Sequence, residues 1–146
     1  MLLVTIKQDK LKGFAKDPEM LHSAKRPCVL VVHLKYKGRR YDFAVPLRSN
    51  IHPSTPKDEY FPLPPRSKTK SRHRHGIHYT KMFPIERSWT ERFHTEDNMH
   101  SSIMKGIIDK NEKVIVNACK RYLADYENGI RPAFCTDIDY LITLLP

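Results

Sequence analysis

Hydrophobic runs and polar breaks along the first half of the chain predict a set of short strands. Residues 2–6 and 28–36 are apolar and rich in β-branched side chains, so both are expected to be strands. The Lys37-Gly38 step favours a tight turn. Residues 39–47 are therefore expected to run back along 28–36 and form a hairpin with it.

Prolines interrupt this pattern after the hairpin. Pro46 cannot donate a hydrogen bond to a neighbouring strand, so pairing should loosen just before Arg48 and Ser49. Residues 50–76 contain five prolines and many polar groups, and they predict a long loop of a length that is usually functional or disordered. Residues 77–85 predict the next strand.

From about Ser101 the spacing of the apolar residues changes to that of a helix. One face of the predicted long helix carries five apolar or aromatic side chains, Ile108, Ile115, Cys119, Tyr122 and Tyr126. The Asn128-Gly129 step is expected to end the helix. Thr136 or Asp137 can cap a short packed helix in the apolar tail. Strands first and helices later predict an α+β fold with a small, strongly bent antiparallel sheet.

Length and charge predict a single basic domain. The 146 residues, 1–146, are expected to form a single domain, and 26 Lys and Arg against 16 Asp and Glu give a formal charge of +10, which attracts phosphates. The three cysteines, Cys28, Cys119 and Cys135, lie outside any C-x-x-C pattern, so no disulfide framework is expected. No apolar run is long enough to cross a bilayer, and we expect a cytoplasmic protein without membrane partners.

A cationic loop favours nucleic acid as the partner. Residues 66–74 carry five Lys or Arg and no acid, and aromatic residues that suit stacking on unpaired bases flank the loop, with Tyr60 and Phe61 before it and Tyr79 after it. RNA contacts are predicted at Arg39, Arg40, Asn50, Arg66, Lys68, Lys70, Arg72, Arg74, His78 and Tyr79. The alternative for the loop is a solvated, mobile segment.

Two short motifs and the helix after them resemble a known family. The Pro46-Leu47-Arg48-Ser49 step and the Ile-x-x-x-Lys-x-x-Pro-Ile pattern of residues 77–85, followed by the amphipathic helix, resemble type III toxin-antitoxin toxins. These are the ToxN/AbiQ-type endoribonucleases, and the motif sequences are most similar to those of the TenpN and CptN-like branches. The resemblance covers residues 27–126. The resemblance implies a compact, twisted, barrel-like antiparallel sheet with packed helices, similar to the MazF/Kid toxins.

The resemblance also implies an activity and partners. Such toxins cleave an RNA substrate without metal or other cofactor and serve in phage defence. A small, repeated, structured antitoxin RNA neutralises them by direct binding, and a protein–RNA hetero-oligomer is therefore expected.

Candidate catalytic residues follow from matching the motif position by position. Ser49 matches the catalytic serine of the family, Arg48 stands where some members have a hydroxyl residue, and Ile51 stands where some have a lysine. Either Arg48 or Lys81 can therefore supply the positive charge that this lysine supplies in other members. His52, three residues after Ser49, is a candidate acid or base.

The chemistry can be judged without the family. Metal-free cleavage uses the 2'-hydroxyl of the RNA as nucleophile and leaves a 2',3'-cyclic phosphate and a 5'-hydroxyl, so the protein supplies proton transfer and cations. No paired carboxylates flank the candidate site, which disfavours a two-metal nuclease.

Each candidate also has a simpler interpretation. Ser49-Asn50 can be a turn that caps backbone amides, and Lys81 and His52 can be ordinary surface residues. His73, His75 and His78 form an H-x-H-x-x-H pattern that can bind zinc, but no further ligand is apparent and the neighbouring arginines oppose a divalent cation. At the level of function, the alternatives are a non-catalytic RNA- or DNA-binding module and a basic structural or ribosome-associated protein.

Overall fold

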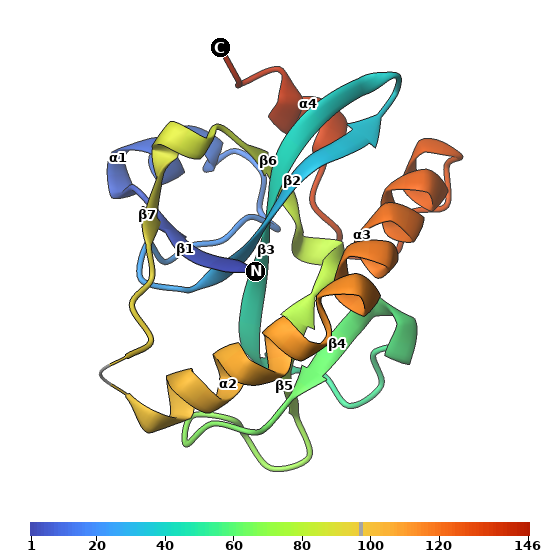
Figure 1. Cartoon of the computed structure of the whole chain (residues 1–146). Helices are drawn as coiled ribbons and strands as arrows, with labels where there is room; N and C mark the ends of the chain where they lie inside the picture. The colour runs from blue at the N-terminus through green and yellow to red at the C-terminus, as the bar shows by residue number, and fades with distance from the viewer. Residues whose placement is uncertain (97) are drawn as a thin grey trace.

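Seven strands and four helices make up the protein, whose computed structural model describes residues 1–96 and 98–146 (Figure 1). The strands are β1 (Leu2–Ile6), β2 (Cys28–Tyr36), β3 (Arg39–Ile51), β4 (Tyr60–Leu63), β5 (Arg74–His78), β6 (Phe83–Ile85) and β7 (Thr90–Arg92). The helices are α1 (Gln8–Leu11), α2 (Met99–Lys110), α3 (Glu112–Glu127) and α4 (Ile138–Ile142). Single 3-10 turns cover η1 (Lys12–Phe14), η2 (Lys57–Glu59), η3 (Tyr79–Lys81) and η4 (Arg87–Trp89).

The strands form one antiparallel sheet, and the predicted α+β class is confirmed. Its order is β4-β5-β3-β2-β1-β7, with β6 also paired to β3. In the described part of the chain, β4 and β7 end the strand order and β6 has β3 as its one partner, so the sheet does not close into the barrel that the family resemblance implies. None of the helices in residues 1–96 and 98–146 combines the length and the apolar character that a bilayer crossing needs.

Strand β3 changes partner halfway along its length. It pairs with β2 up to Pro46, which lies opposite Cys28, and the predicted hairpin is confirmed. On its other edge β3 pairs first with β6, at residues 42–44, and from Leu47 with β5, where Arg48 lies opposite Gly76. The register shifts between Arg48 and Ile51, so a bulge ends the strand. Pro46 therefore ends one ladder as predicted, but the strand continues into a second one.

Two predicted boundaries are wrong. The loop expected over residues 50–76 contains β4 and the start of β5, which pair with each other, and Pro62 is tolerated because β4 is an edge strand. The strand expected over residues 77–85 is interrupted by η3, because β5 and β6 pair with different segments of β3 and the chain must step from one to the other.

Alternation along β3 divides the core between the two faces of the sheet. Phe43, Val45 and Leu47 pack in the cluster that includes the buried side of α2 and α3. Ala44 packs in the other cluster, with Phe14 of η1. Figure 1 shows α2 and α3 as a nearly continuous diagonal that rises from the lower left to the right, away from α1 on the upper left. Each face of β3 is therefore covered by different elements.

The helical stripe predicted from the sequence is confirmed. Its five side chains are buried, although Asn111 divides the segment into α2 and α3 instead of one helix. Gly129, at φ +85°, ends α3, and Asp137 caps α4 by accepting a hydrogen bond from the Tyr140 amide. The predicted short C-terminal helix is confirmed.

Candidate nucleic-acid site

Ser49 and Arg48 lie on opposite faces of β3. Successive side chains of a strand point to opposite sides. Ser49 therefore follows Leu47 toward α2, where it lines a pocket that we call the Ser49 pocket. Arg48 lines a different one, which we call the Arg48 pocket. The four catalytic candidates are thus divided, because His52 and Lys81 lie with Arg48.

The Ser49 pocket is a strongly cationic hollow of 310 Å³ between β3, the segment before β2 and the start of α2. Its polar lining consists of Ser23, Lys25, Arg26, Ser49, Arg66, Lys68, His100 and Ser101. No carboxylate is among the residues that line it. The first turn of α2, capped by Asn98, adds the positive end of a helix dipole. All of these features favour a phosphate.

Arg26 connects this pocket to the backbone of β3. Its guanidinium donates a hydrogen bond to the Leu47 carbonyl at 3.2 Å. The position of the cation relative to Ser49 is thereby fixed through the strand itself. Neither Arg26 nor Lys25 was identified from the sequence, because they belong to an irregular segment whose place beside Ser49 depends on the tertiary fold.

One imidazole, that of His100, lines the Ser49 pocket, and the buried His75 stacks against it. The rings of His75 and His100 stack with centroids 6.2 Å apart and planes inclined by 29°. His75 Nδ1 lies 2.7 Å from the Pro64 carbonyl, which can only accept, so this nitrogen carries a proton. Burial lowers the pKa of His75 and outweighs the hydrogen bond to Pro64, which raises it; nearby Arg66, His100 and Arg26 lower it further. His75 is therefore held neutral, with Nε2 as an acceptor.

His100 has an unsatisfied nitrogen. Its Nε2 is buried and has no hydrogen-bond partner among the described residues. His100 could not be identified from the sequence, since it lies 51 positions from Ser49 and belongs to no motif. A buried polar atom without a partner in a phosphate-sized cationic pocket is a candidate for contact with a ligand.

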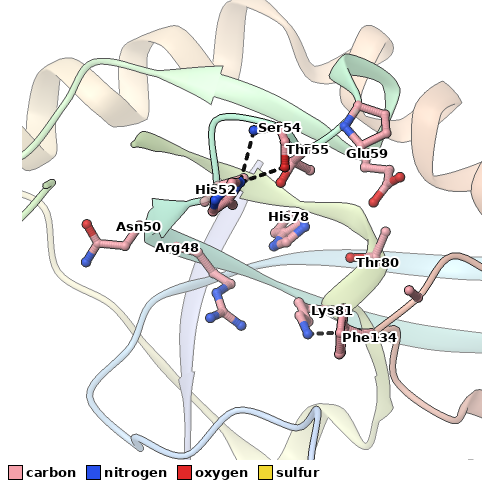
Figure 2. A pocket seen from close by; sticks show the side chains of 13 residues that line it. Arg48, Asn50, His52, Ser54, Thr55, Glu59, His78, Thr80, Lys81 and Phe134 are labelled. Carbon is pink, nitrogen blue, oxygen red and sulfur yellow. Dashed lines mark hydrogen bonds between the residues drawn. The ribbon is translucent and has the colours of Figure 1, made fainter. Parts of the chain in front are cut away.

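The Arg48 pocket is larger, with a volume of 630 Å³. Figure 2 shows Arg48, His52, His78 and Lys81 around it, with Phe134 beside Lys81. Burial lowers the pKa of Arg48 and the nearby Arg26 lowers it further, while Glu19 opposes the shift. Arginine remains charged at neutral pH under such perturbation. The pocket thus combines a half-buried cation with a carboxylate, Glu59, a second cation, Lys81, and neutral polar and aromatic groups.

Lys81 is buried, at 8% exposure, and its charge is compensated. Its ammonium forms an ion pair with Glu19 and donates to the Phe134 carbonyl. Two of its three donors are thereby used by the protein. This geometry favours a positioning role for Lys81 and differs from the free surface lysine that the sequence allowed.

His78 and His52 have different environments in the Arg48 pocket. His78 is 9% exposed, and burial, reinforced by Arg48 and Lys81, lowers its pKa to about 3. Its Nδ1 has no partner among the described residues. His52 is exposed, and its Nδ1 accepts a hydrogen bond from the Ser54 amide at 3.1 Å, so its proton in the neutral form is on Nε2.

Replacing His78 with glutamine is expected to weaken the acid sensitivity of the fold. Because an unfolded histidine has a pKa near 6.5 and His78 in the folded protein about 3, the unfolded chain binds the extra proton as the pH falls below 6.5. Between pH 7 and pH 5 this group should remove about 2 kcal/mol from the free energy of unfolding. Urea unfolding at both pH values measures the loss, which should be smaller in His78→Gln by about that amount. An identical pH dependence in wild type and variant would contradict the buried neutral state, and His94→Gln at the exposed surface controls for loss of a histidine.

The remaining predicted RNA contacts fall into three groups. Arg66 and Lys68 line the Ser49 pocket, and the Lys70 amide donates to Asn50 Oδ1 at 2.8 Å. Arg72 is exposed in the same loop, and Arg74 is exposed at the first position of β5. Arg39 and Arg40 are exposed at the hairpin tip, at the opposite end of β3 from both pockets.

The aromatic rings predicted to stack on bases are not free to do so. Tyr79 is 3% exposed and belongs to the core cluster that includes α3, so its ring is packed inside the protein. Tyr60 is buried as well, and Phe61 packs against the same core. Periodicity alone did not separate these rings from surface ones. Phe134, which the sequence did not single out, is the exposed ring at the Arg48 pocket.

The histidine pattern does not assemble as a metal site. His73 contacts the ring of His52, His75 stacks on His100, and His78 lines the Arg48 pocket. Within the described ranges no group of three or more His, Cys, Asp or Glu side chains is arranged to hold a metal ion.

Comparisons with known proteins were made at the level of sequence and of structure. No protein-family model matches the sequence, and no curated protein matches it either. One solved structure, from a bacterial antiviral system regulated by a processed non-coding RNA, is 14% identical with a TM-score of 0.69 and covers 98% of this chain and 96% of that chain. Another, from work on bacterial type III toxin-antitoxin systems with selective toxin inhibition by a non-coding RNA pseudoknot, is 17% identical with a TM-score of 0.71 and covers 97% and 94%. These two structures confirm the resemblance of the chain to type III toxin-antitoxin proteins at the level of the fold.

Proposed function

We propose that this protein is a metal-independent endoribonuclease toxin of a type III toxin-antitoxin system. It cleaves RNA by attack of the 2'-hydroxyl on the adjacent phosphorus, leaves a 2',3'-cyclic phosphate and a 5'-hydroxyl, and is neutralised by direct binding of a structured antitoxin RNA. A role in phage defence and a cytoplasmic location follow from this assignment. The near-complete overlap with the fold of RNA-regulated toxin and antiviral proteins supports it.

The observation that carries the proposal is the composition of the Ser49 pocket. Four cationic side chains, three hydroxyls and an imidazole line a hollow that no carboxylate lines. A phosphorane transition state carries more negative charge than the ground state, so fixed cations and donors stabilise it preferentially. Such a site needs no metal, because the lysines and arginines supply the charge that a divalent ion supplies elsewhere.

Roles can be assigned to this pocket and to the histidine stacked on its lining. Ser49 donates its hydroxyl to a non-bridging phosphate oxygen, and Arg26, fixed on the Leu47 carbonyl, supplies a cation. His75, neutral with Nε2 as an acceptor, and His100, with Nε2 unsatisfied, are the candidate base and acid. Arg48, Lys81 and His52, the other candidates from the sequence, lie across the strand and are assigned to binding of the neighbouring nucleotides.

The reaction is tested by incubating the protein with RNA in EDTA and analysing the product ends. We expect cleavage that is unchanged by the chelator, 5' ends that polynucleotide kinase labels without prior phosphatase treatment, and 3' ends that acid opens from a cyclic phosphate. Loss of cleavage in EDTA, or products with 5'-phosphates, would contradict the proposed chemistry. Tight RNA binding without any cleavage would instead favour the non-catalytic binding module.

Replacing Arg72 and Arg74 by alanine is expected to weaken neutralisation more than cleavage. Arg72 is exposed in the loop before β5, Arg74 is exposed at the first position of β5, and both lie outside both pocket linings. Loss of two phosphate contacts to unpaired RNA should flatten the logarithmic salt slope of binding by about 1.4, since each contact contributes about 0.7. Titration of the RNA between low and high salt measures this slope. Lys12→Ala/Lys16→Ala, at exposed positions near α1, is the charge-matched control, and an unchanged slope in the loop variant would place the RNA elsewhere.

A further inference from the structure

The proposed cleavage step takes none of its chemistry from the Arg48 pocket, and the part of the RNA that this pocket contacts is not yet defined, although it is twice the volume of the Ser49 pocket. Its 630 Å³ falls within the range of about 300–1,000 Å³ that is usual for small-ligand sites. Its lining differs in kind from that of the Ser49 pocket, because it combines Arg48 and the ion-paired Lys81 with one carboxylate, Glu59, and with neutral polar groups and an aromatic ring.

Phe134 is the most unusual residue of this pocket. Its side chain is 75% exposed, and its φ of 61° lies in the left-handed region that a bulky residue rarely adopts. Large exposed rings on a highly charged surface suit contact with a partner that has an apolar face.

Polar contacts fix the segment that presents this ring. Lys81, anchored by Glu19, donates to the Phe134 carbonyl, as the dashed line in Figure 2 shows. Two residues later, the Thr136 amide donates to the Thr80 carbonyl at 3.1 Å and the Thr136 hydroxyl donates to the Met82 carbonyl. The strained conformation is therefore imposed by neighbours inside the fold, and the ring is held outward at the pocket rim.

Neutral hydrogen-bonding groups face the interior. His78 Nδ1 is buried without a partner in the described part of the chain, and Figure 2 shows this ring inside the pocket. Asn50 uses its Oδ1 to accept from the Lys70 amide, so its two amide hydrogens remain for a ligand. A purine or pyrimidine edge offers the complementary donors and acceptors.

We infer that the Arg48 pocket binds one unpaired nucleobase of the RNA, with the base stacked on Phe134, its edge toward His78 and Asn50, and its phosphate at Arg48. This inference rests on RNA as the partner in the proposed function. The pocket adjoins the end of β3 that also carries Ser49, so the base belongs to a nucleotide near the scissile phosphate. The same chemistry serves a substrate strand and an unpaired position of an antitoxin RNA.

The test measures binding, so that it stands apart from cleavage. Fluorescence anisotropy of ten-nucleotide rA, rU and rC oligonucleotides is measured in a Ser49→Ala background that also carries Phe134→Leu or Phe134→Tyr. Stacking of one base is expected to give Phe134→Leu about a tenfold weaker Kd for at least one oligonucleotide, while Phe134→Tyr stays within about twofold. Ile130→Ala, which also removes exposed apolar surface, is the control and should leave binding unchanged.

A second variant fills the pocket and leaves the native contacts in place. Ala133 is exposed and lines the pocket, so Ala133→Trp should weaken binding of the same oligonucleotide by about tenfold. Ala124→Trp, on the exposed side of α3 and outside the pocket linings, should have no effect.

Comparison of single-stranded with duplex RNA separates recognition of an unpaired base from general electrostatic attraction to the RNA backbone. A blunt ten-base-pair RNA duplex, which offers no unpaired base, should bind equally well to Phe134→Leu and to the parent protein. Equal loss for duplex and single strand, or no loss in either Phe134→Leu or Ala133→Trp, would overturn the inference. Cleavage of a short substrate and neutralisation by a structured RNA, assayed with an intact Ser49, then show which of the two strands supplies the base. If the wild type never cleaves RNA, the proposed function fails while this binding result stands.

Discussion

Substitution of Ser49 by alanine is expected to slow single-turnover cleavage by about 10²–10³-fold, the usual effect of removing one preorganised donor from a charged transition state. Ser49 is half-buried in the cationic pocket, and its hydroxyl has no hydrogen-bond partner among the described residues. The donor is therefore free for the substrate, and its loss leaves no buried group unpaired. The rate is measured with saturating protein and a short labelled RNA, so that weak binding cannot mimic slow chemistry.

The matched control is Ser88→Ala, at an exposed position of η4 outside both pockets. It should cleave RNA at the wild-type rate. Thermal unfolding should be the same for all three proteins. If folded Ser49→Ala cleaved RNA at the wild-type rate, the Ser49 pocket would not be the site of the reaction. The groups around Arg48 would then be the remaining candidates.

Substitution of Gly76 by alanine is expected to destabilise the fold by about 3 kcal/mol, at the upper end of ordinary overpacking. A Cβ atom at this position would lie 2.4 Å from the Phe61 carbonyl oxygen, and that oxygen belongs to the backbone of β4, which cannot move like a flexible side chain. Gly76 pairs with Pro62 on one side and Arg48 on the other. Separation of β4 from β5 should therefore also disturb the strand segment that carries Arg48 and Ser49.

Urea unfolding measures this effect, and a second glycine provides the contrast. Gly106 lies in the exposed middle of α2, where an added Cβ meets nothing within 4 Å. Gly106→Ala should stabilise the protein by about 0.5–1 kcal/mol, because alanine restricts the unfolded chain and favours the helix. A Gly76→Ala variant as stable as wild type would mean that β4 is not held against β5 as described.

Local pattern was sufficient to predict the central elements of the fold. The hairpin of β2 and β3, the end of the β2 ladder at Pro46 and the buried stripe of α2 and α3 all follow from side-chain period and turn chemistry. Strand β4 was missed because its proline suggested a loop. Pro62 is nevertheless compatible with a strand that has a neighbour on one side only, and edge position is a property of the whole sheet.

The candidate site was harder to predict, because its parts come from distant segments. Arg48 and Ser49 were grouped as one cluster since they are adjacent in sequence, whereas a continuing strand places adjacent residues on opposite faces. Arg26, His100 and Phe134 reach the site through tertiary packing that no short motif encodes. The burial of Tyr79 likewise depends on α3, more than thirty residues further along the chain.

The change of partner along β3 has a consequence for how such a protein can diversify. The second ladder carries odd-numbered Ser49 toward one pocket and even-numbered Arg48 and Asn50 toward the other, with a single backbone as the wall between them. Substitutions at the even positions can therefore alter which RNA is chosen without touching the groups assigned to chemistry. An insertion or deletion of one residue between Pro46 and Ser49 would exchange the two sets and abolish both tasks at once. Sequence drift at this strand should accordingly proceed by replacement, at constant length.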